Sequence, residues 1–314
     1  MHKYIYIVKT GRGGLLRHLR KYFSIFRPEM KIKIISLTPT KRILKYSKQI
    51  KNNEVDYFVI SNGSDPVDVK LKRRILDINP EQKFLFSEYG WLPWKSFLLL
   101  DRKGIGNHSS IFDMDMSQIH TNINNDLREY THHKIRAATG RGKKVPYKNY
   151  VMVPLQINND SKLKIGSPHF KRVEEFVDYI VSCVPKDVQI LFKNHPEAKK
   201  NIPIPKLPNV IDVTKSGYSK KSLIENAQFV AGINSTFLLE SLFYKQKTIA
   251  YGLDVFSNKG IVLDGFGKTY DEILAHTPNH NHIDKFIDLL ISRQIPQRDS
   301  LGWYDLMKNN KGVW

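Results

Sequence analysis

The feature that most constrains the fold is an alternation of short β-branched and aromatic runs with amphipathic stretches. Runs with the composition of strands lie at residues 4–8, 31–37, 57–61 and 83–86, and a second series lies at 150–157, 189–193, 229–231 and 248–251. Helical spacing of apolar residues occurs between them, at 40–51, 169–183 and 236–244. This alternation predicts right-handed βαβ units and parallel sheets.

A break separates the two series. Residues 139–148 are rich in Gly and Lys and contain Pro146, a composition typical of a linker. We therefore predict an N-terminal Rossmann-like domain at 1–148 and a C-terminal Rossmann-like domain at 149–275. The remaining residues, 276–314, hold an amphipathic helix at 283–292 and a tail with Trp303 and Trp314, and we expect them to pack back on the first domain. Two doubly wound domains facing a central cleft would bind ligands where their strands end.

Composition limits the compartment and the partners. The chain of 314 residues has one cysteine, Cys183, so an intrachain disulfide is impossible and a reducing compartment is expected. The N-terminal run lacks a signal-peptide pattern, and no apolar run approaches the roughly 20 residues of a membrane span. These observations predict a cytoplasmic protein.

The chain is strongly basic, with 50 Lys and Arg against 30 Asp and Glu, a formal charge of +20. Such a surplus favours anionic partners, among them nucleotides, acidic glycans and an anionic inner membrane leaflet that the protein could meet peripherally. Nucleic acid is not expected, because no basic and aromatic recognition module is present.

Two carboxylates follow predicted strands, one in each half. Glu88 follows the run 83–86 and precedes Gly90, and Asp160 lies in the loop after the run 150–157. Each alone reads as an ordinary polar turn residue. As a pair on opposite walls of a cleft, they would suit glycosyl transfer with retention, which needs a nucleophile and an acid/base.

Polar residues of a second kind follow two further strands of the second half. Lys193, Asn194, His195 and Pro196 end the run 189–193, and Asn234, Ser235 and Thr236 open the helix that carries Glu240. A cation, an imidazole and a helix N-terminus suit a phosphate. Solvated and capping roles explain the same residues without a ligand.

Two clusters resemble metal sites, and we expect no metal at either. Asp113 and Asp115 lie in a polar loop rather than at a strand end, and His276, His280 and His282 crowd a turn rich in Asn and Pro. No cofactor is therefore expected. The glycine loop with Gly11 and Arg12 permits close approach of a ligand but lacks a full phosphate-loop pattern.

Several of these segments together resemble the bacterial β-Kdo transferases of capsule and lipopolysaccharide biosynthesis. The resemblance rests on Ser87-Glu88-Tyr89-Gly90-Trp91-Leu92-Pro93, on Gln156 with Asp160, on residues 193–196 and on residues 234–240, and it spans roughly residues 57–260. It implies a GT-B-like fold, CMP-β-Kdo as the donor, and double displacement through a covalent adduct of Kdo with the enzyme.

The resemblance also implies roles for individual residues. Asp160 would be the nucleophile and Glu88 the acid/base. Residues expected to bind CMP or Kdo are Gln156, Lys193, Asn194, His195, Pro196, Asn234, Ser235, Thr236 and Glu240. Residues expected on the acceptor side, where a lipid-linked or oligosaccharide acceptor would bind, are Gly11, Arg12, Tyr89 and Trp91.

Two other functions remain open from the sequence. An inverting sialyltransferase would share a CMP donor and the residues at 193–196 and 234–236, but it would need no nucleophile at Asp160. A nonenzymatic module that binds anionic glycan or nucleic acid would need only the charge.

Overall fold

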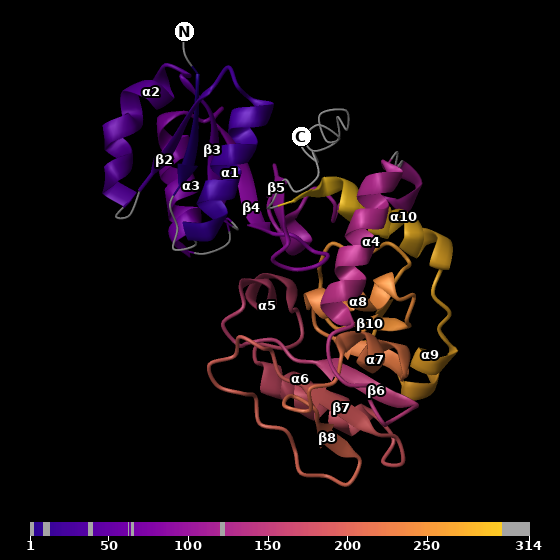
Figure 1. The fold of residues 1–314 in the computed structure, drawn as a ribbon. Helices are drawn as coiled ribbons and strands as arrows, with labels where there is room; N and C mark the ends of the chain where they lie inside the picture. The colour runs from indigo at the N-terminus through magenta and orange to yellow at the C-terminus, as the bar shows by residue number, and fades with distance from the viewer. Residues whose placement is uncertain are drawn as a thin grey trace. The chain divides into compact units, whose positions relative to one another are not determined.

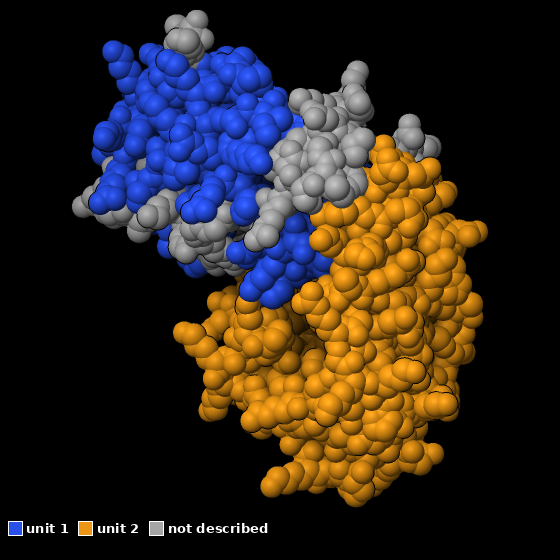
Figure 2. Space-filling view, in the orientation of Figure 1, with its two compact units in different colours: residues 1–113, 292–314 blue, residues 114–291 orange. Residues whose placement is uncertain are grey.

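The computed structural model describes residues 3–8, 13–36, 40–61, 63, 66–119 and 123–296. The chain divides into two compact units, which Figure 2 shows in different colours: residues 1–113 with 292–314 form unit 1, and residues 114–291 form unit 2. Among the described residues, no helix combines the length and the apolar character that crossing a membrane would require.

Unit 1 is built around a six-stranded sheet in the order β12-β5-β4-β3-β1-β2. The strands β1 to β4 are parallel, whereas β5 runs antiparallel to β4 and β12 antiparallel to β5. The bounds of its elements are β1 Tyr4–Val8, α1 Gly13–Phe26, β2 Lys31–Ile35, η1 Thr40–Tyr46, α2 Ser47–Lys51, β3 Val55–Ser61, α3 Pro66–Ile78, β4 Lys83–Tyr89, β5 Phe97–Asp101, η2 Gly106–His108 and β12 Gln294–Pro296.

Helices cover both faces of this sheet (Figure 1). On one face, Leu16, Leu19 and Phe23 of α1 pack against Ile5 and Val59 of the strands. On the other face, α2 and α3 pack their buried side chains against β1, β3 and β4. The apolar residues of α1 recur at a spacing of three and four, so one stripe of the helix is buried and the opposite stripe carries Arg17 and Arg20.

Unit 2 contains a second six-stranded sheet, parallel throughout, in the order β11-β10-β9-β6-β7-β8. The bounds of its elements are η3 Met116–Gln118, α4 Asn125–Thr139, β6 Tyr150–Pro154, α5 Ser161–Gly166, α6 Val173–Cys183, β7 Ile190–Lys193, β8 Val210–Asp212, α7 Lys220–Glu225, β9 Ala227–Gly232, α8 Thr236–Phe243, β10 Thr248–Ala250, β11 Leu263–Asp264, α9 Tyr270–Ala275 and α10 His280–Arg293.

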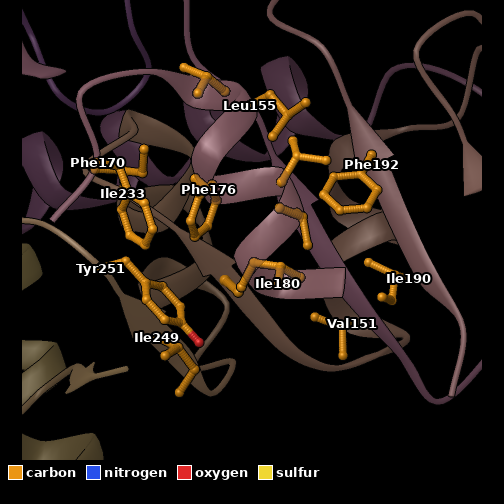
Figure 3. Close-up of a cluster of buried hydrophobic side chains, with 14 of the residues drawn as sticks. Val151, Leu155, Phe170, Phe176, Ile180, Ile190, Phe192, Ile233, Ile249 and Tyr251 are labelled. Carbon is orange, nitrogen blue, oxygen red and sulfur yellow. The ribbon is translucent and has the colours of Figure 1, made fainter. Parts of the chain in front are cut away.

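One face of the second sheet is covered by α6, whose apolar residues follow helical spacing. Phe176 and Ile180 pack with Val151 of β6, Phe192 of β7 and Tyr251 in a single buried cluster (Figure 3). The helices α7 and α8 contact β9 and β10. Burial of both faces accounts for the nearly continuous apolar runs of these strands, as expected for a parallel sheet.

The strand order of unit 2 fixes where a ligand can bind. Counted along the chain from β6, the order is that of the Rossmann fold, with the first strand between the second and the fourth. The direction of winding therefore reverses between β6 and β9. In such sheets, ligands bind beside the carboxyl ends of the strands at this switch point.

The division at residue 113 differs from the boundary predicted near residue 148. The helix α4 belongs to unit 2, where Arg128 forms an ion pair with Asp288 at 2.7 Å. The Gly- and Lys-rich stretch is also tied to unit 2, because the amide of Lys143 donates to the carbonyl of Gly217 at 2.8 Å. The linker composition thus belongs to an ordered edge of unit 2.

The C-terminal segment also differs from the prediction. The expected helix is present as α10, but most of it belongs to unit 2, and the chain joins unit 1 through β12, where Ile295 pairs with Leu98. Trp303 and Trp314 lie outside the described residues.

Candidate active site

Asp160 lies at the switch point of unit 2, just after β6. It is the N-cap of α5, and its Oδ1 accepts a hydrogen bond from the amide of Lys162 at 2.9 Å. Its Oδ2 accepts a longer hydrogen bond, 3.4 Å, from Nε2 of Gln156. These two hydrogen bonds orient the carboxylate, and because Asp160 is only half-buried, solvent still reaches it.

Gln156 and Asn234 join the loops that follow the neighbouring strands β6 and β9. Nε2 of Gln156 donates to Oδ1 of Asn234 at 2.8 Å, and the amide of Asn234 donates to Oε1 of Gln156 at 3.2 Å. Nδ2 of Asn234 donates to the carbonyls of Lys162 and Leu253 at 2.8 and 3.2 Å. Asn234 is fully buried, at 0% exposed, so the structure gives it a positioning role in place of the predicted donor contact.

A buried ion pair supports the same loop, and sequence reasoning missed it. Nζ of Lys162 lies 2.9 Å from Oδ2 of Asp254, a residue with no exposed surface. The other oxygen of Asp254 accepts from the amide of Val255 at 2.7 Å. Because a buried carboxylate needs such partners, the pair anchors the first turn of α5 to the loop after β10.

Lys193 ends β7 and is a half-buried cation at this edge of the sheet. The structure gives its Nζ no hydrogen bond and no ion pair among the described residues. Burial lowers the pKa of Lys193, and the charge of Lys220 lowers it further, whereas Asp212 acts in the opposite direction. A half-buried ammonium in this state is stabilised by an anion.

The residues after Lys193 divide into two kinds. Asn194 is buried and fixes the loop, since its Oδ1 accepts from the amide of Ile202 at 2.7 Å and its amide donates to Oγ1 of Thr214 at 2.9 Å. His195 is half-buried, and its Nδ1 accepts from the amide of Glu197 at 3.1 Å. Pro196 is exposed. Asn194 therefore shapes the turn, and His195 and Pro196 border its accessible side.

The start of α8 is arranged as predicted for its first residues. Ser235 is the N-cap and accepts from the amide of Phe237 at 3.2 Å, and both Ser235 and Thr236 are half-buried. Glu240 differs from its predicted contact with the donor. It is 2% exposed, and its two oxygens accept from Nζ of Lys220 at 2.7 and 2.8 Å.

A cavity of about 190 Å³ opens beside the carboxyl ends of β10 and β11. Tyr251 and the backbone of Gly252 form part of its wall, and polar groups come from Ser257, Asn258 and Asp264. His169 also lines the cavity, and its ring stacks on Phe266 with 3.6 Å between centroids. An aromatic wall with a few polar groups suits a flat heterocycle.

Glu88 belongs to unit 1 and lies within β4, opposite Leu99 of β5. The predicted turn is absent at this position, because β5 returns along β4 and extends the ladder to Tyr89. Oε1 of Glu88 accepts from the amide of Tyr89 at 2.9 Å, and the residue is half-buried. Gly90 follows where Cβ would lie 2.5 Å from Cβ of Phe97, which explains the need for glycine.

The other residues predicted on the acceptor side differ in their exposure to solvent. The ring of Tyr89 lies edge-on to Trp94 at 6.1 Å and is half-buried. Trp91 is 5% exposed and so belongs to the core. Gly11 and Arg12 lie outside the described residues.

Of the two clusters with metal-like spacing, the aspartates have other partners. Asp113 forms an ion pair with Lys103 at 2.6 Å, and Asp115 caps η3 through the amide of Ser117. His276 follows α9, where burial and then the charge of Lys247 lower its pKa. Within the described ranges, no group of three or more His, Cys, Asp or Glu could hold a metal ion.

The chain is similar to known proteins at the levels of fold and family. Two Thermosulfurimonas dismutans KpsC structures match it. The beta Kdo 2,4 transferase has a TM-score of 0.62 and 16% identity over 92% of this chain and 90% of that chain. The beta Kdo 2,7 transferase has a TM-score of 0.58 and 18% identity over 91% and 90%. The predicted fold class, GT-B-like with two Rossmann-like domains, is confirmed.

Sequence comparison adds a relative and a family. Protein FixF of Sinorhizobium fredii (strain NBRC 101917 / NGR234) is 29% identical over 118 residues, which are 37% of this chain and 29% of FixF. The chain therefore matches less than a third of that relative. The family model of capsule polysaccharide biosynthesis proteins matches residues 107–293, more than half of the sequence. The chain thus belongs to the capsule polysaccharide biosynthesis protein family.

Proposed function

We propose that this chain is a retaining β-Kdo glycosyltransferase that moves Kdo from CMP-β-Kdo to a glycan acceptor. The observation that carries the proposal is Asp160, a solvent-accessible carboxylate oriented by Gln156 and the first turn of α5 at the switch point of unit 2. An oriented carboxylate is what a double displacement needs at the anomeric carbon. The family and the fold shared with two Kdo transferases support the choice of sugar.

In the first step, a carboxylate oxygen of Asp160 attacks the anomeric carbon of Kdo. The bond from that carbon to the phosphate oxygen breaks, and CMP leaves with the electron pair. Oδ2 is the better candidate for the attack, because its hydrogen bond from Gln156 is 3.4 Å long, whereas Oδ1 is held at 2.9 Å by the amide of Lys162.

In the second step, Glu88 removes the proton from the acceptor hydroxyl. The acceptor oxygen attacks the anomeric carbon, and the bond to Asp160 breaks to return a free carboxylate. Two inversions give net retention. The proposal requires both units to act on one substrate, since Asp160 belongs to unit 2 and Glu88 to unit 1.

The donor would be held by the other groups at the same edge of unit 2. Lys193 and the first turn of α8 would meet the phosphate, and His195 would border it. The cavity beside Tyr251 would take the cytosine ring. No metal is required, because one phosphate needs less charge than a diphosphate.

The acceptor and the location follow from the same proposal. A lipid-linked or oligosaccharide acceptor of surface polysaccharide synthesis would be displayed at the cytoplasmic face of the inner membrane, and peripheral contact with anionic lipid would be favoured by the +20 charge.

The proposal is tested by intact-protein mass spectrometry of wild type, Glu88→Gln and Asp160→Ala after incubation with CMP-Kdo generated in situ. We expect a mass gain of one Kdo in Glu88→Gln, where turnover to the acceptor is blocked, and no gain in Asp160→Ala. Consumption of CMP-sialic acid in place of CMP-Kdo, without a covalent gain, would instead establish an inverting sialyltransferase. No turnover or binding of either donor would leave a nonenzymatic module.

A further inference from the structure

Glu240 is a buried carboxylate at the end of the first turn of α8, and its partner is a lysine outside the predicted site. It is 2% exposed, and Nζ of Lys220 donates to both of its oxygens at 2.7 and 2.8 Å. An unpaired carboxylate at this depth would be strongly unfavourable. Glu240 therefore fixes the position of the Lys220 ammonium.

The ion pair with Glu240 leaves Lys220 one further N–H donor. An ammonium has three N–H donors, and Glu240 accepts two hydrogen bonds from it. The remaining donor has no acceptor among the residues that the structure describes, and the side chain is 38% exposed. Lys220 also lies 5.8 Å from the ring centroid of Phe237 in the first turn of α8. Its charged end is thus beside the helix start that follows β9.

Lys193 brings a second ammonium to this place from the end of β7. Lys193 pairs with Pro154 at the end of β6, and β6 lies between β7 and β9 in the sheet, so Lys193 reaches the carboxyl edge from which α8 begins. The charge of Lys220 lowers the pKa of Lys193, after the larger effect of burial. Asp212 offsets this in part, but its Oδ1 already accepts from the amide of Thr214 at 2.8 Å. Two like charges with free N–H donors beside a helix N-terminus are stabilised by an anion.

We propose that Lys220, held by Glu240, and Lys193 together bind the phosphate of the nucleotide donor. This inference rests on the proposed function. In this arrangement, Glu240 positions Lys220 and does not contact the donor. Lys220 is a second cation, in addition to Lys193, where negative charge develops on the leaving phosphate.

The test is calorimetric titration of the full chain with CMP and with cytidine, which lacks the phosphate. Lys220→Met alone would leave Glu240 buried and unpaired, so the main variant is Lys220→Met/Glu240→Gln, which removes both charges. Because a hydrogen bond to a charged group contributes about 1.5–3 kcal/mol, we expect CMP affinity to fall about tenfold to a hundredfold. Cytidine affinity should stay at the wild-type value.

Lys221→Met is the matched control. Lys221 is the next residue of α7, and it pairs with Glu225 at 3.7 Å with both side chains about half exposed. Its CMP affinity should equal that of wild type, and Lys220→Arg should keep most of the affinity.

Unchanged CMP binding in the double variant would overturn the inference while leaving the proposed function intact. An equal loss of CMP and cytidine would also overturn it, because the pair would then act only on the fold. A wild-type chain that binds neither ligand would overturn the proposed function together with the inference.

Discussion

The two units differ in how their sheets end and in how their candidate catalytic residues are held. The sheet of unit 2 is parallel throughout, and the loops at its switch point are joined by buried side-chain hydrogen bonds from Gln156 and Asn234. The sheet of unit 1 ends in two antiparallel strands, and Glu88 lies inside the β4–β5 ladder rather than in a loop. Buried amide networks permit few alternative arrangements. The loops at the switch point of unit 2 are thus held in one arrangement.

Charge separates the units as well. The excess of Lys and Arg is larger in unit 1 than in unit 2. In unit 2, lysines at the candidate site pair with buried carboxylates, as Lys162 does with Asp254 and Lys220 with Glu240. On unit 1, Arg17, Arg20 and Lys21 line an open depression next to β2. The lysines at the candidate site of unit 2 are thus largely paired, whereas unit 1 carries the larger excess of positive charge.

The largest expected effect comes from a substitution that removes the proposed nucleophile of unit 2 and keeps its structure. Asp160→Asn keeps an oxygen to cap α5 but removes the attacking charge, so we expect transfer to fall by about 10⁴-fold or more. The melting temperature should change little, because even complete loss of an N-cap costs only about 1 kcal/mol of stability. Transfer at the wild-type rate would remove Asp160 as the nucleophile.

The next prediction asks whether the two units unfold separately. Phe176→Ala removes a buried ring from the core of unit 2 and should lower its free energy of unfolding by about 3–5 kcal/mol. Residues 114–291 contain no tryptophan, whereas Trp91 and Trp94 lie in unit 1. In a urea titration, we expect far-UV circular dichroism to gain an earlier transition while the midpoint of tryptophan fluorescence stays unchanged.

Leu238→Ala, in α8 of the same unit, should give the same pattern and serves as the companion variant. Coincident shifts of both signals in either variant would contradict separate unfolding of the units.

A smaller effect is expected from the amide network itself. Gln156→Leu removes the hydrogen bond to Asp160 and those to Asn234, so the nucleophile loses part of its orientation. Because misplacement of a reacting group by about 1 Å costs about a hundredfold, we expect kcat to fall tenfold to a hundredfold with little change in KM. A rise in KM at constant kcat would show that Gln156 binds the donor directly.

The sequence predicted local features well, because they depend on near neighbours. The run at 4–8 is the strand β1, and the alternation of strands and helices placed Asp160, Lys193 and Ser235 at one edge of one sheet. Helix α8 begins at Thr236, as its Ser/Thr start indicated. In each case, the information lies within a few residues of the feature.

Features that depend on distant partners could not be predicted. The ladder that encloses Glu88 requires β5 and also β12, whose Gln294 donates to the carbonyl of Leu92 across 202 residues. Glu240 was expected at the donor from the resemblance, whereas in the structure it is buried against Lys220, which lies on another helix. Helical position alone gives no sign of such a partner.

The smallest expected effect is the pH dependence of CMP affinity, which tests the role of Lys193 in the charge of unit 2. Burial and the charge of Lys220 lower the pKa of Lys193, so its ammonium loses the proton below the ordinary lysine pKa of about 10.4. Phosphate binds the protonated form of Lys193, and CMP affinity should therefore decrease as pH rises through that lowered pKa. Above it, the fall is at most about tenfold per pH unit.

Titration with CMP above about pH 8 measures this decrease, since the second pKa of a phosphate monoester is about 6 and the phosphate keeps its charge there. Lys193→Met should bind CMP more weakly and should lose the part of the pH dependence that begins below the ordinary lysine range. Cytidine serves as the control ligand, because its binding involves no phosphate and should not follow the titration of Lys193. If Lys193→Met kept the wild-type profile, the decrease would have to come from another cation, and Lys193 would lose its role in the anion site of unit 2.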